Sequence, residues 1–263
     1  MKKQKIKILH VLKSMDIGGI ETYIMNMYRH IDKEIYEFDF LLWEKHKSFY
    51  ENEIKQLGGN IYKFNFSRNP ISNVINFYKF LNVRNYDVVH CHTLFYSGFF
   101  AFGNYMKNKK NNIFISHVHS KSDNHRKNFL RFLYKKLTRY LILKYSTFYC
   151  ACSKEAAKYV FGDNIDAIIL KDYINTDNYL YPNVDNVVKI KKDLKLTNKL
   201  ILGNVGRLSV EKNQIFIIEL VDYLLKNKYD VKCILIGDGP EREKLERIVS
   251  EKGINIIFIS III

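Results

Sequence analysis

The sequence is poor in the residues that interrupt or cross-link a chain. Its 263 residues include 3 prolines and 12 glycines, which argues against a linker-rich or low-complexity protein. The four cysteines (Cys91, Cys150, Cys152 and Cys233) form no Cys-x-x-Cys spacing. Scattered thiols in a chain of this length are typical of a reducing cytosol and not of a disulfide framework.

Long apolar runs are also missing. No stretch reaches the roughly 18 apolar residues that a membrane-spanning helix requires. The first apolar segment, Ile6 to Leu12, contains Lys7 and His10 and is too short for the core of a signal peptide. We therefore predict a soluble, cytoplasmic protein, with peripheral contact to the inner face of the cell membrane as an open alternative.

Negative charge is scarce relative to positive charge. There are 42 lysines and arginines against 27 aspartates and glutamates, a net charge of +15. Such a charge favours anionic partners: phosphates, anionic lipid surfaces or nucleic acid. Nucleotide bias in the gene can produce much of this charge, because the chain is rich in Lys, Asn and Ile. No recognisable RNA- or DNA-binding motif is present, so we do not predict a nucleic-acid partner.

Short apolar runs alternate with amphipathic segments along most of the chain. This alternation predicts an α/β domain over residues 1–180, with a mostly parallel sheet covered on both faces. A second α/β region follows over residues 181–263 and contains three strand-like runs, 200–205, 231–236 and 254–259. Three strands make a thin sheet, so we expect an incomplete domain with poorly covered apolar surface.

One strand-to-helix connection carries two cations. After the strand-like run 200–205, Gly206 permits a tight turn with positive φ, and a helix-like run begins near Asn213. Arg207 and Lys212 lie on the loop between them. Cations and backbone N–H groups at such a junction suit a phosphate or diphosphate. The alternative is a solvated loop with two ordinary surface cations.

A glycine pair, Gly18 and Gly19, stands between the first strand and a helix-like segment. Glycines there let the backbone approach a phosphate or a sugar, with the helix N-terminus behind it. The simpler interpretation is a loop that needs positive φ. No Gly-x-Gly-x-x-Gly is present, which argues against a nicotinamide-dependent enzyme.

Two His-x-His pairs follow neighbouring strands: His90 with His92, and His117 with His119. Both members of a pair point to one face, because side chains alternate along a strand. Imidazoles near neutrality act as bases, as hydrogen-bond donors to sugar hydroxyls or as metal ligands. No cysteine or carboxylate completes a recognisable ligand spacing, so we do not predict a metal site. The alternative is loop histidines with ordinary partners.

Residues 126–144 form a basic helix-like segment that mixes lysines and arginines with phenylalanines and leucines. Such a helix can lie on an anionic bilayer. The alternative is an ordinary helix with one face in the core and one in water. We keep peripheral membrane contact through this segment as a hypothesis.

These motifs resemble those of family 4 retaining glycosyltransferases, which have the two-domain GT-B fold. Gly206-Arg207-Leu208 followed by Glu211-Lys212-Asn213 is similar to the family's donor-binding loop. The resemblance therefore implies that Arg207 and Lys212 bind the diphosphate of a nucleotide-sugar. Ile17-Gly18-Gly19-Ile20-Glu21-Thr22 is similar to the family's glycine-rich cleft loop, and Gly237-Asp238-Gly239-Pro240 is common after the second strand of the second domain.

Ser116-His117-Val118-His119-Ser120 resembles a segment of capsule and exopolysaccharide members. One histidine of that segment contacts the transferred sugar in the family, so His119, and after it His117, are the implied catalytic residues. The family completes its donor site with two glutamates further along the second domain. The chain ends before that point, so we expect a C-terminally truncated copy with an incomplete second Rossmann-like domain.

The predicted function is transfer of a hexose from a nucleotide-sugar, such as a UDP-sugar, to a glycan or lipid-linked acceptor in surface polysaccharide biosynthesis. The resemblance implies retention of configuration and no bound metal or other cofactor. Truncation would leave this chain inactive. The alternative is a non-catalytic remnant that binds a glycan or a membrane surface.

Overall fold

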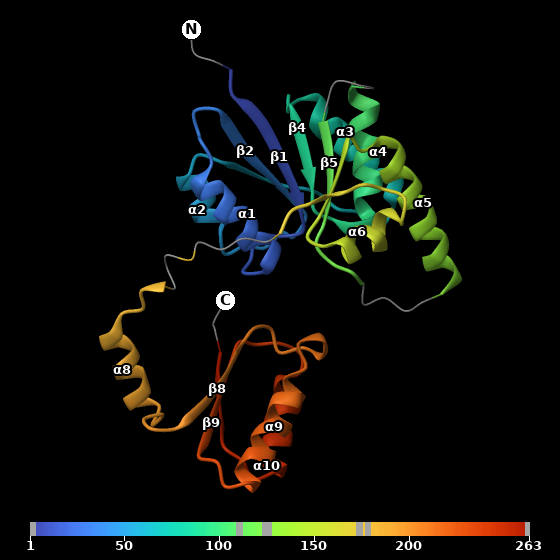
Figure 1. Cartoon of the computed structure of the whole chain (residues 1–263). Helices are drawn as coiled ribbons and strands as arrows, with labels where there is room; N and C mark the ends of the chain where they lie inside the picture. The colour runs from blue at the N-terminus through green and yellow to red at the C-terminus, as the bar shows by residue number, and fades with distance from the viewer. Residues whose placement is uncertain (1–3, 109–112, 123–127, 172–175, 177–179, 261–263) are drawn as a thin grey trace. The chain divides into compact units, whose positions relative to one another are not determined.

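A computed structural model describes residues 4–108, 113–122, 128–171, 176 and 180–260 (Figure 1). The chain divides into two compact units, Met1–Asn175 and Thr176–Ile263. The sequence analysis placed this boundary at residue 180. Both units are parallel sheets with helices, so the predicted α/β class is confirmed.

The first unit contains a seven-stranded parallel sheet in the order β3-β2-β1-β4-β5-β6-β7. Its strands are β1 (Ile6–Leu12), β2 (Tyr36–Leu42), β3 (Asn60–Lys63), β4 (Val88–Cys91), β5 (Ile113–Val118), β6 (Phe148–Ala151) and β7 (Ile168–Ile169). The strand order reverses between β1 and β4. In open parallel sheets, ligands bind beyond the carboxyl ends of the strands at such a switch point.

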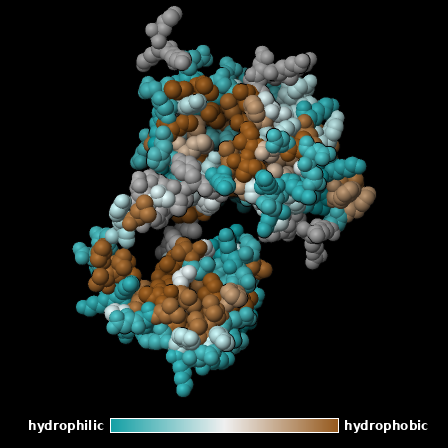
Figure 2. Space-filling view, in the orientation of Figure 1, coloured by the Kyte–Doolittle hydropathy of each residue, from teal (hydrophilic) through white to brown (hydrophobic). Residues whose placement is uncertain are grey.

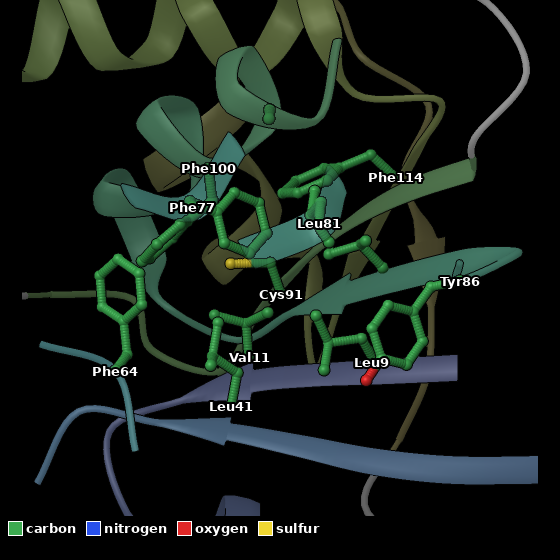
Figure 3. Packing of buried hydrophobic residues seen from close by; sticks show 12 residues of the cluster. Leu9, Val11, Leu41, Phe64, Phe77, Leu81, Tyr86, Cys91, Phe100 and Phe114 are labelled. Carbon is green, nitrogen blue, oxygen red and sulfur yellow. The ribbon is translucent and has the colours of Figure 1, made fainter. Parts of the chain in front are cut away.

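Helices cover both faces of this sheet, as predicted (Figure 1). They are α1 (Gly19–His30), α2 (Glu51–Gln56), α3 (Pro70–Asn82), α4 (Ser97–Asn108), α5 (Phe129–Tyr145) and α6 (Lys154–Phe161). Alternate residues of β1 face two cores. Leu9 and Val11 pack with α3 and α4, where Phe77 and Phe100 approach Cys91 (Figure 3). Residues on the opposite side of β1, such as Leu12, pack with α1 and α2.

Two helices of this unit begin beside a side-chain hydrogen bond. A 3-10 turn, Leu94–Tyr96, comes first and α4 begins at Ser97. The Ser97 hydroxyl donates a 2.6 Å hydrogen bond to the carbonyl of Leu94, which has a positive φ of 48°. The basic helix α5 begins at Phe129, where the Asn128 side chain accepts from a first-turn N–H group. Residues 126–127 of the predicted helix lie outside the described residues.

The second unit contains a three-stranded parallel sheet in the order β10-β9-β8. Its elements are α8 (Val184–Asp193), β8 (Leu200–Val205), α9 (Gln214–Lys226), β9 (Val231–Ile236), α10 (Arg242–Glu251) and β10 (Ile256–Ile259). Helices α9 and α10 pack with the strands into one core, on one face of the sheet. The edge strand β8 has no buried residue, and Figure 2 shows apolar residues gathered over β8 and β9. The expected poor coverage of this sheet is therefore observed.

None of the described helices, in either unit, is long and apolar enough to cross a bilayer.

Candidate functional site

Five histidines gather at the switch point of the first sheet. His10 lies on β1, His90 on β4 and His117 on β5, and His92 and His119 follow β4 and β5 directly. The two-residue period of a strand places each of them on the sheet face that α1 covers. We call these five residues the histidine cluster. Both His-x-His pairs of the sequence thus meet at one place.

The imidazole rings of the histidine cluster lie within hydrogen-bonding distance of one another. Nδ1 of His10 is 3.2 Å from Nε2 of His92, and Nδ1 of His92 is 3.0 Å from Nε2 of His119. Nε2 of His90 is 3.1 Å from Nδ1 of His117. His92 therefore joins His10 to His119 through both of its ring nitrogens.

Burial keeps the histidine cluster uncharged. His10 and His117 are 0% and 1% exposed, His90 and His92 are also buried, and His119 is half-buried. Burial lowers the pKa of His10 to about 3, that of His117 to about 2 and that of His119 to about 4. The pKa values of His90 and His92 are also lowered, first by burial and then by the neighbouring imidazoles. Each ring at neutral pH therefore has one N–H donor and one acceptor nitrogen.

The sequence singled out four of these five histidines, and it missed His10. His10 is the register partner of His90 across β1 and β4. Its position near the end of the first strand is the same kind of signal as the His-x-His pairs. A histidine at the end of one strand indicates a shared site only when β1 and β4 are known to be neighbours. The structure brings His117 and His119 together as predicted, and their catalytic roles stay predictions.

The predicted glycine pair begins α1. Gly18 is the N-cap residue, with φ −157° and ψ 172°, and neither Gly18 nor Gly19 has positive φ. The positive-φ interpretation is therefore wrong. A Cβ atom on Gly18 would lie 2.3 Å from Oε2 of Glu21, which is the end of a flexible side chain that can move away. Nothing lies within 4 Å of a Cβ atom placed on Gly19.

Two further features of the first unit involve neighbours of the histidine cluster in space or in sequence. Tyr23 of α1 contacts the rings of His117 and His119, at centroid distances of 5.9 and 6.1 Å. A hollow of about 530 Å³ is lined by Thr93 and Leu94, the two residues after His92. The rest of its lining is mostly aromatic and basic: Phe66, Arg68, Pro70, Phe95, Tyr96, Arg131 and Tyr134. Rings and guanidinium groups of this kind contact sugars and anionic oxygens.

In the second unit, the loop after β8 is fixed to the loop after β9. Gly206 has a positive φ of 154°, as predicted, and the N–H of Leu208 donates a 2.9 Å hydrogen bond to the carbonyl of Asp238. A Cβ atom on Gly237 would lie 2.1 Å from the oxygen of Gly206, and one on Gly239 would lie 2.3 Å from that of Leu208. The Gly-Asp-Gly motif is therefore needed because the two loops touch.

Arg207 and Lys212 lie on the first of these loops with exposed side chains. The amide of buried Gln214 donates to the carbonyl of Arg207 at 3.0 Å and to Oδ1 of Asn204 at 3.3 Å. Gln214 therefore holds the backbone that carries Arg207, a role that the sequence analysis missed. The two predicted cations lie on an ordered loop beside the N-terminus of the 13-residue helix α9.

The helix α5 exposes apolar as well as basic side chains. Phe129, Leu130 and Phe132 are 72%, 75% and 61% exposed, and Lys136 is exposed among them. Its buried residues are Thr138 and Ile142. An ordinary helix would turn its large apolar residues to the core. The exposed ones are therefore compatible with the hypothesis of membrane contact and do not test it.

The fold is that of GT-B glycosyltransferases. Anabaena HepE in complex with UDP-glucose matches with a TM-score of 0.76 at 16% identity, over 97% of this chain and 69% of HepE. The lipopolysaccharide outer core galactosyltransferase WaaB matches with a TM-score of 0.62 at 20% identity, over 97% of this chain and 68% of WaaB. Likeness at these identities shows the fold alone.

A model of Glycosyltransferase Family 4 matches residues 17–168, more than half of the chain, and a model of glycosyl transferases group 1 matches residues 187–261. The chain belongs to glycosyltransferase family 4. It is 31% identical to the putative glycosyltransferase EpsF of Bacillus subtilis (strain 168), over 91% of this chain and 64% of EpsF. It is 25% identical to the capsular polysaccharide biosynthesis glycosyltransferase CapH of Staphylococcus aureus, over 95% of this chain and 68% of CapH. The chain thus spans about two thirds of the length of these relatives.

Proposed function

We propose that the protein transfers a hexose from a UDP-sugar to a glycan or lipid-linked acceptor in surface polysaccharide biosynthesis, with retention of configuration. Membership of family 4 supports transfer, and the similarity to CapH supports the polysaccharide context. The complexes of HepE with UDP and UDP-glucose support a UDP-sugar donor. The observation that carries the proposal is the ordered loop that presents Arg207 and Lys212 at a strand-to-helix junction.

In this proposal Arg207 and Lys212 bind the diphosphate of the donor. Negative charge develops on the leaving diphosphate as the bond to the sugar breaks. Fixed cations and backbone N–H groups stabilise that charge more in the transition state than in the ground state. No metal ion or other cofactor takes part.

His119 orients the transferred sugar in this proposal, and His117 supports it. His119 is the half-buried member of the histidine cluster, and the other four members are buried. Its neutral ring donates or accepts a hydrogen bond without the cost of removing a charge from water. Gly18 and Gly19 leave the N-terminus of α1 open to donor and acceptor.

The hollow beside Thr93 and Leu94 is the proposed acceptor site. Its aromatic rings suit the apolar faces of a sugar, and its two arginines suit anionic groups of a glycan or of a lipid carrier. We propose in addition that α5 touches the inner face of the cell membrane, where a lipid-linked acceptor would lie.

The alternative function is glycan or membrane-surface binding without transfer. The hollow favours it, because its described lining belongs to the first unit alone and needs no donor. Turnover of UDP-hexose by the purified chain with polysaccharide-repeat acceptors would exclude this alternative. Glycan binding that persists without any affinity for UDP would support it.

UDP titration calorimetry tests the donor site. We expect Arg207→Ala and Lys212→Ala each to weaken UDP binding about 10- to 100-fold, because each removes a charge-assisted hydrogen bond worth roughly 1.5–3 kcal/mol. Lys191→Ala is the matched control, since it removes an exposed cation of the same unit from α8. Equal UDP affinities for all four proteins would refute the proposed donor site.

Co-sedimentation with anionic vesicles tests the membrane contact. We expect Phe132→Ser to lower the bound fraction severalfold, because Phe132 is a 61% exposed apolar residue of α5. Phe216→Ser in α9 is the control, since Phe216 is 59% exposed and lies outside the proposed surface. Binding that is the same with neutral and anionic vesicles would contradict the hypothesis of membrane contact.

A further inference from the structure

A pocket of about 430 Å³ lies at the edge of the first sheet opposite to the histidine cluster. Its lining includes residues from the amino ends of the strands: Lys7 near the start of β1, Glu37 near that of β2 and Asn60 at that of β3. Asp87, immediately before β4, also belongs to this edge. The histidine cluster lies at the carboxyl ends of the strands, so the pocket is separate from the candidate site.

The charges of the pocket nearly cancel. Its carboxylates are those of Glu37, Asp39 and Asp87, and its cations are those of Lys7 and Arg84, a net charge of 2 − 3 = −1. A lining with both signs close together attracts neither an anion nor a cation strongly. Small-molecule pockets of roughly 300–1,000 Å³ are lined mostly by apolar side chains, whereas most of this lining is charged or carries an amide or hydroxyl group. The lining therefore suits a neutral ligand with many hydrogen-bonding groups.

Arg84 supplies hydrogen-bond donors that the described residues leave unused. Its guanidinium carbon lies 4.3 Å from the centroid of the Tyr62 ring and 4.5 Å from that of the Phe80 ring, and the residue is half-buried. Cation–π attraction to both rings holds the guanidinium in place. In the part of the chain that the structure describes, no acceptor forms a hydrogen bond or an ion pair with this guanidinium. Its N–H groups are therefore available to a ligand.

The groups around Arg84 are fixed by contacts of their own. Asp39 is 5% exposed, and its carboxylate accepts from the backbone N–H and the side-chain amide of Asn60 at 3.0 and 2.9 Å. The Tyr86 hydroxyl donates to the same carboxylate at 2.7 Å. Nζ of Lys107 donates to the carbonyl of Arg84 at 2.7 Å, which holds the backbone after α3. A pocket that is ordered in this way loses little further conformational freedom when a ligand binds.

We propose that this pocket binds a neutral sugar unit of a glycan. Each sugar hydroxyl both donates and accepts, so it can pair with the donors of Arg84 and with the neighbouring carboxylates at once. The side-chain amides of Gln4, Asn60 and Asn85 add further donors and acceptors. The pocket shares no residue with the hollow proposed for the acceptor, so a glycan held here leaves that hollow free. The proposal holds whether or not the chain transfers a sugar.

NMR titration of the complete chain with three neutral disaccharides, lactose, cellobiose and N,N′-diacetylchitobiose, tests this inference. With at least one of them, the side-chain NH₂ signals of Gln4, Asn60 and Asn85 should shift and saturate in the millimolar range, because these amides line the pocket. The described lining of the hollow contains no asparagine or glutamine, so these signals distinguish the two places. Absence of any shift with all three disaccharides would overturn the inference.

Substitution of Arg84 tests the role of its unused donors. Arg84→Ala should weaken the disaccharide about tenfold or more, because it removes charge-assisted hydrogen bonds. Arg84→Lys keeps the charge and loses the planar donors, so it should weaken binding as well. Arg68→Ala is the matched control, since it removes an exposed guanidinium of the same unit from the hollow, and it should leave the affinity unchanged. Equal affinities for Arg84→Ala and the unsubstituted chain would contradict the proposal.

Two further measurements complete the test. Circular dichroism shows whether Arg84→Ala folds, and Asn85→Ala, which alters an exposed residue of the pocket, is the second variant and should also weaken binding. Glucuronate should bind less tightly than glucose, because its negative charge meets three carboxylates in the lining. Tighter binding of glucuronate than of glucose would overturn the assignment to a neutral sugar.

Discussion

The candidate sites of the two units are composed differently. In residues 1–175 the site consists of side chains from three strands, and all eight histidines of the sequence lie in this unit. In residues 176–263 there is no histidine, and the site consists of a short backbone loop with Arg207 and Lys212. A loop site is continuous in sequence, so its motif is visible without a structure. A site built across strands is visible only when the strand order is known.

The largest expected difference between the units is their response to acid. The histidines of the cluster have pKa values far below the 6.5 of an unfolded chain, so between pH 6.5 and 5 the unfolded state binds protons that the folded state does not. The free energy of unfolding of the first unit should therefore decrease as the pH is lowered, by up to about 1.4 kcal/mol per pH unit for each histidine. Above about pH 7.5 both states are neutral and the effect disappears.

Urea unfolding in EDTA at pH 7.5, 6.5 and 5 measures this difference. Trp43 is the only tryptophan of the sequence, so its fluorescence follows the first unit. Circular dichroism follows both units, and the second should show no histidine-linked change. An unchanged Trp43 transition at pH 5 would contradict the buried, neutral state of the cluster.

A core substitution should destabilise the first unit almost as strongly. Phe77 is fully buried, and its ring lies 4.8 Å from that of Phe100. Phe77→Ala should lower the stability of the first unit by about 3–5 kcal/mol, through lost burial and the cavity left behind. The control Phe129→Ala removes a ring that is 72% exposed and should cost less than about 0.5 kcal/mol. Similar costs for both would show that the packing of α3 against α4 is not as described.

The smallest expected effect concerns the second unit. Ala at Gly253 should cost about 1–2 kcal/mol, because φ is +63° there and nothing lies within 4 Å of the added Cβ. Gly237→Ala should cost about 1–3 kcal/mol more, because its Cβ would overlap the oxygen of Gly206. Circular dichroism during urea unfolding measures both variants. Equal stabilities for the two variants would mean that the loops after β8 and β9 do not touch.

Much of the fold could be predicted from apolar periodicity. The strands β1, β8 and β9 have the bounds that the sequence indicates. The positive-φ alternative for the glycine pair was wrong, because Gly18 caps α1 with extended backbone. The 3-10 turn before α4, in which the Ser97 hydroxyl donates to the carbonyl of Leu94, was not predicted. Periodicity contains no information on such contacts.

The candidate sites were predictable to different degrees for the same reason. Arg207 and Lys212 belong to one motif of eight positions, so their loop was predicted as a whole. His10 and His92 are 82 positions apart, and no spacing rule joins them. Gln214 was missed because its amide contacts a carbonyl, and the sequence does not show which backbone atoms a side chain reaches.

The contacts between the loops after β8 and β9 have a consequence for affinity. The N–H groups of Gly206 and Gly237 donate to Ile236 and Ile259, so the ladder of the sheet extends into both loops. A free loop must lose backbone entropy when it closes on a ligand, at roughly 1–2 kcal/mol per residue. The backbone that carries Arg207 has lost that freedom on folding. An anion that docks there needs to order only the side chains, and more of each contact remains as binding free energy.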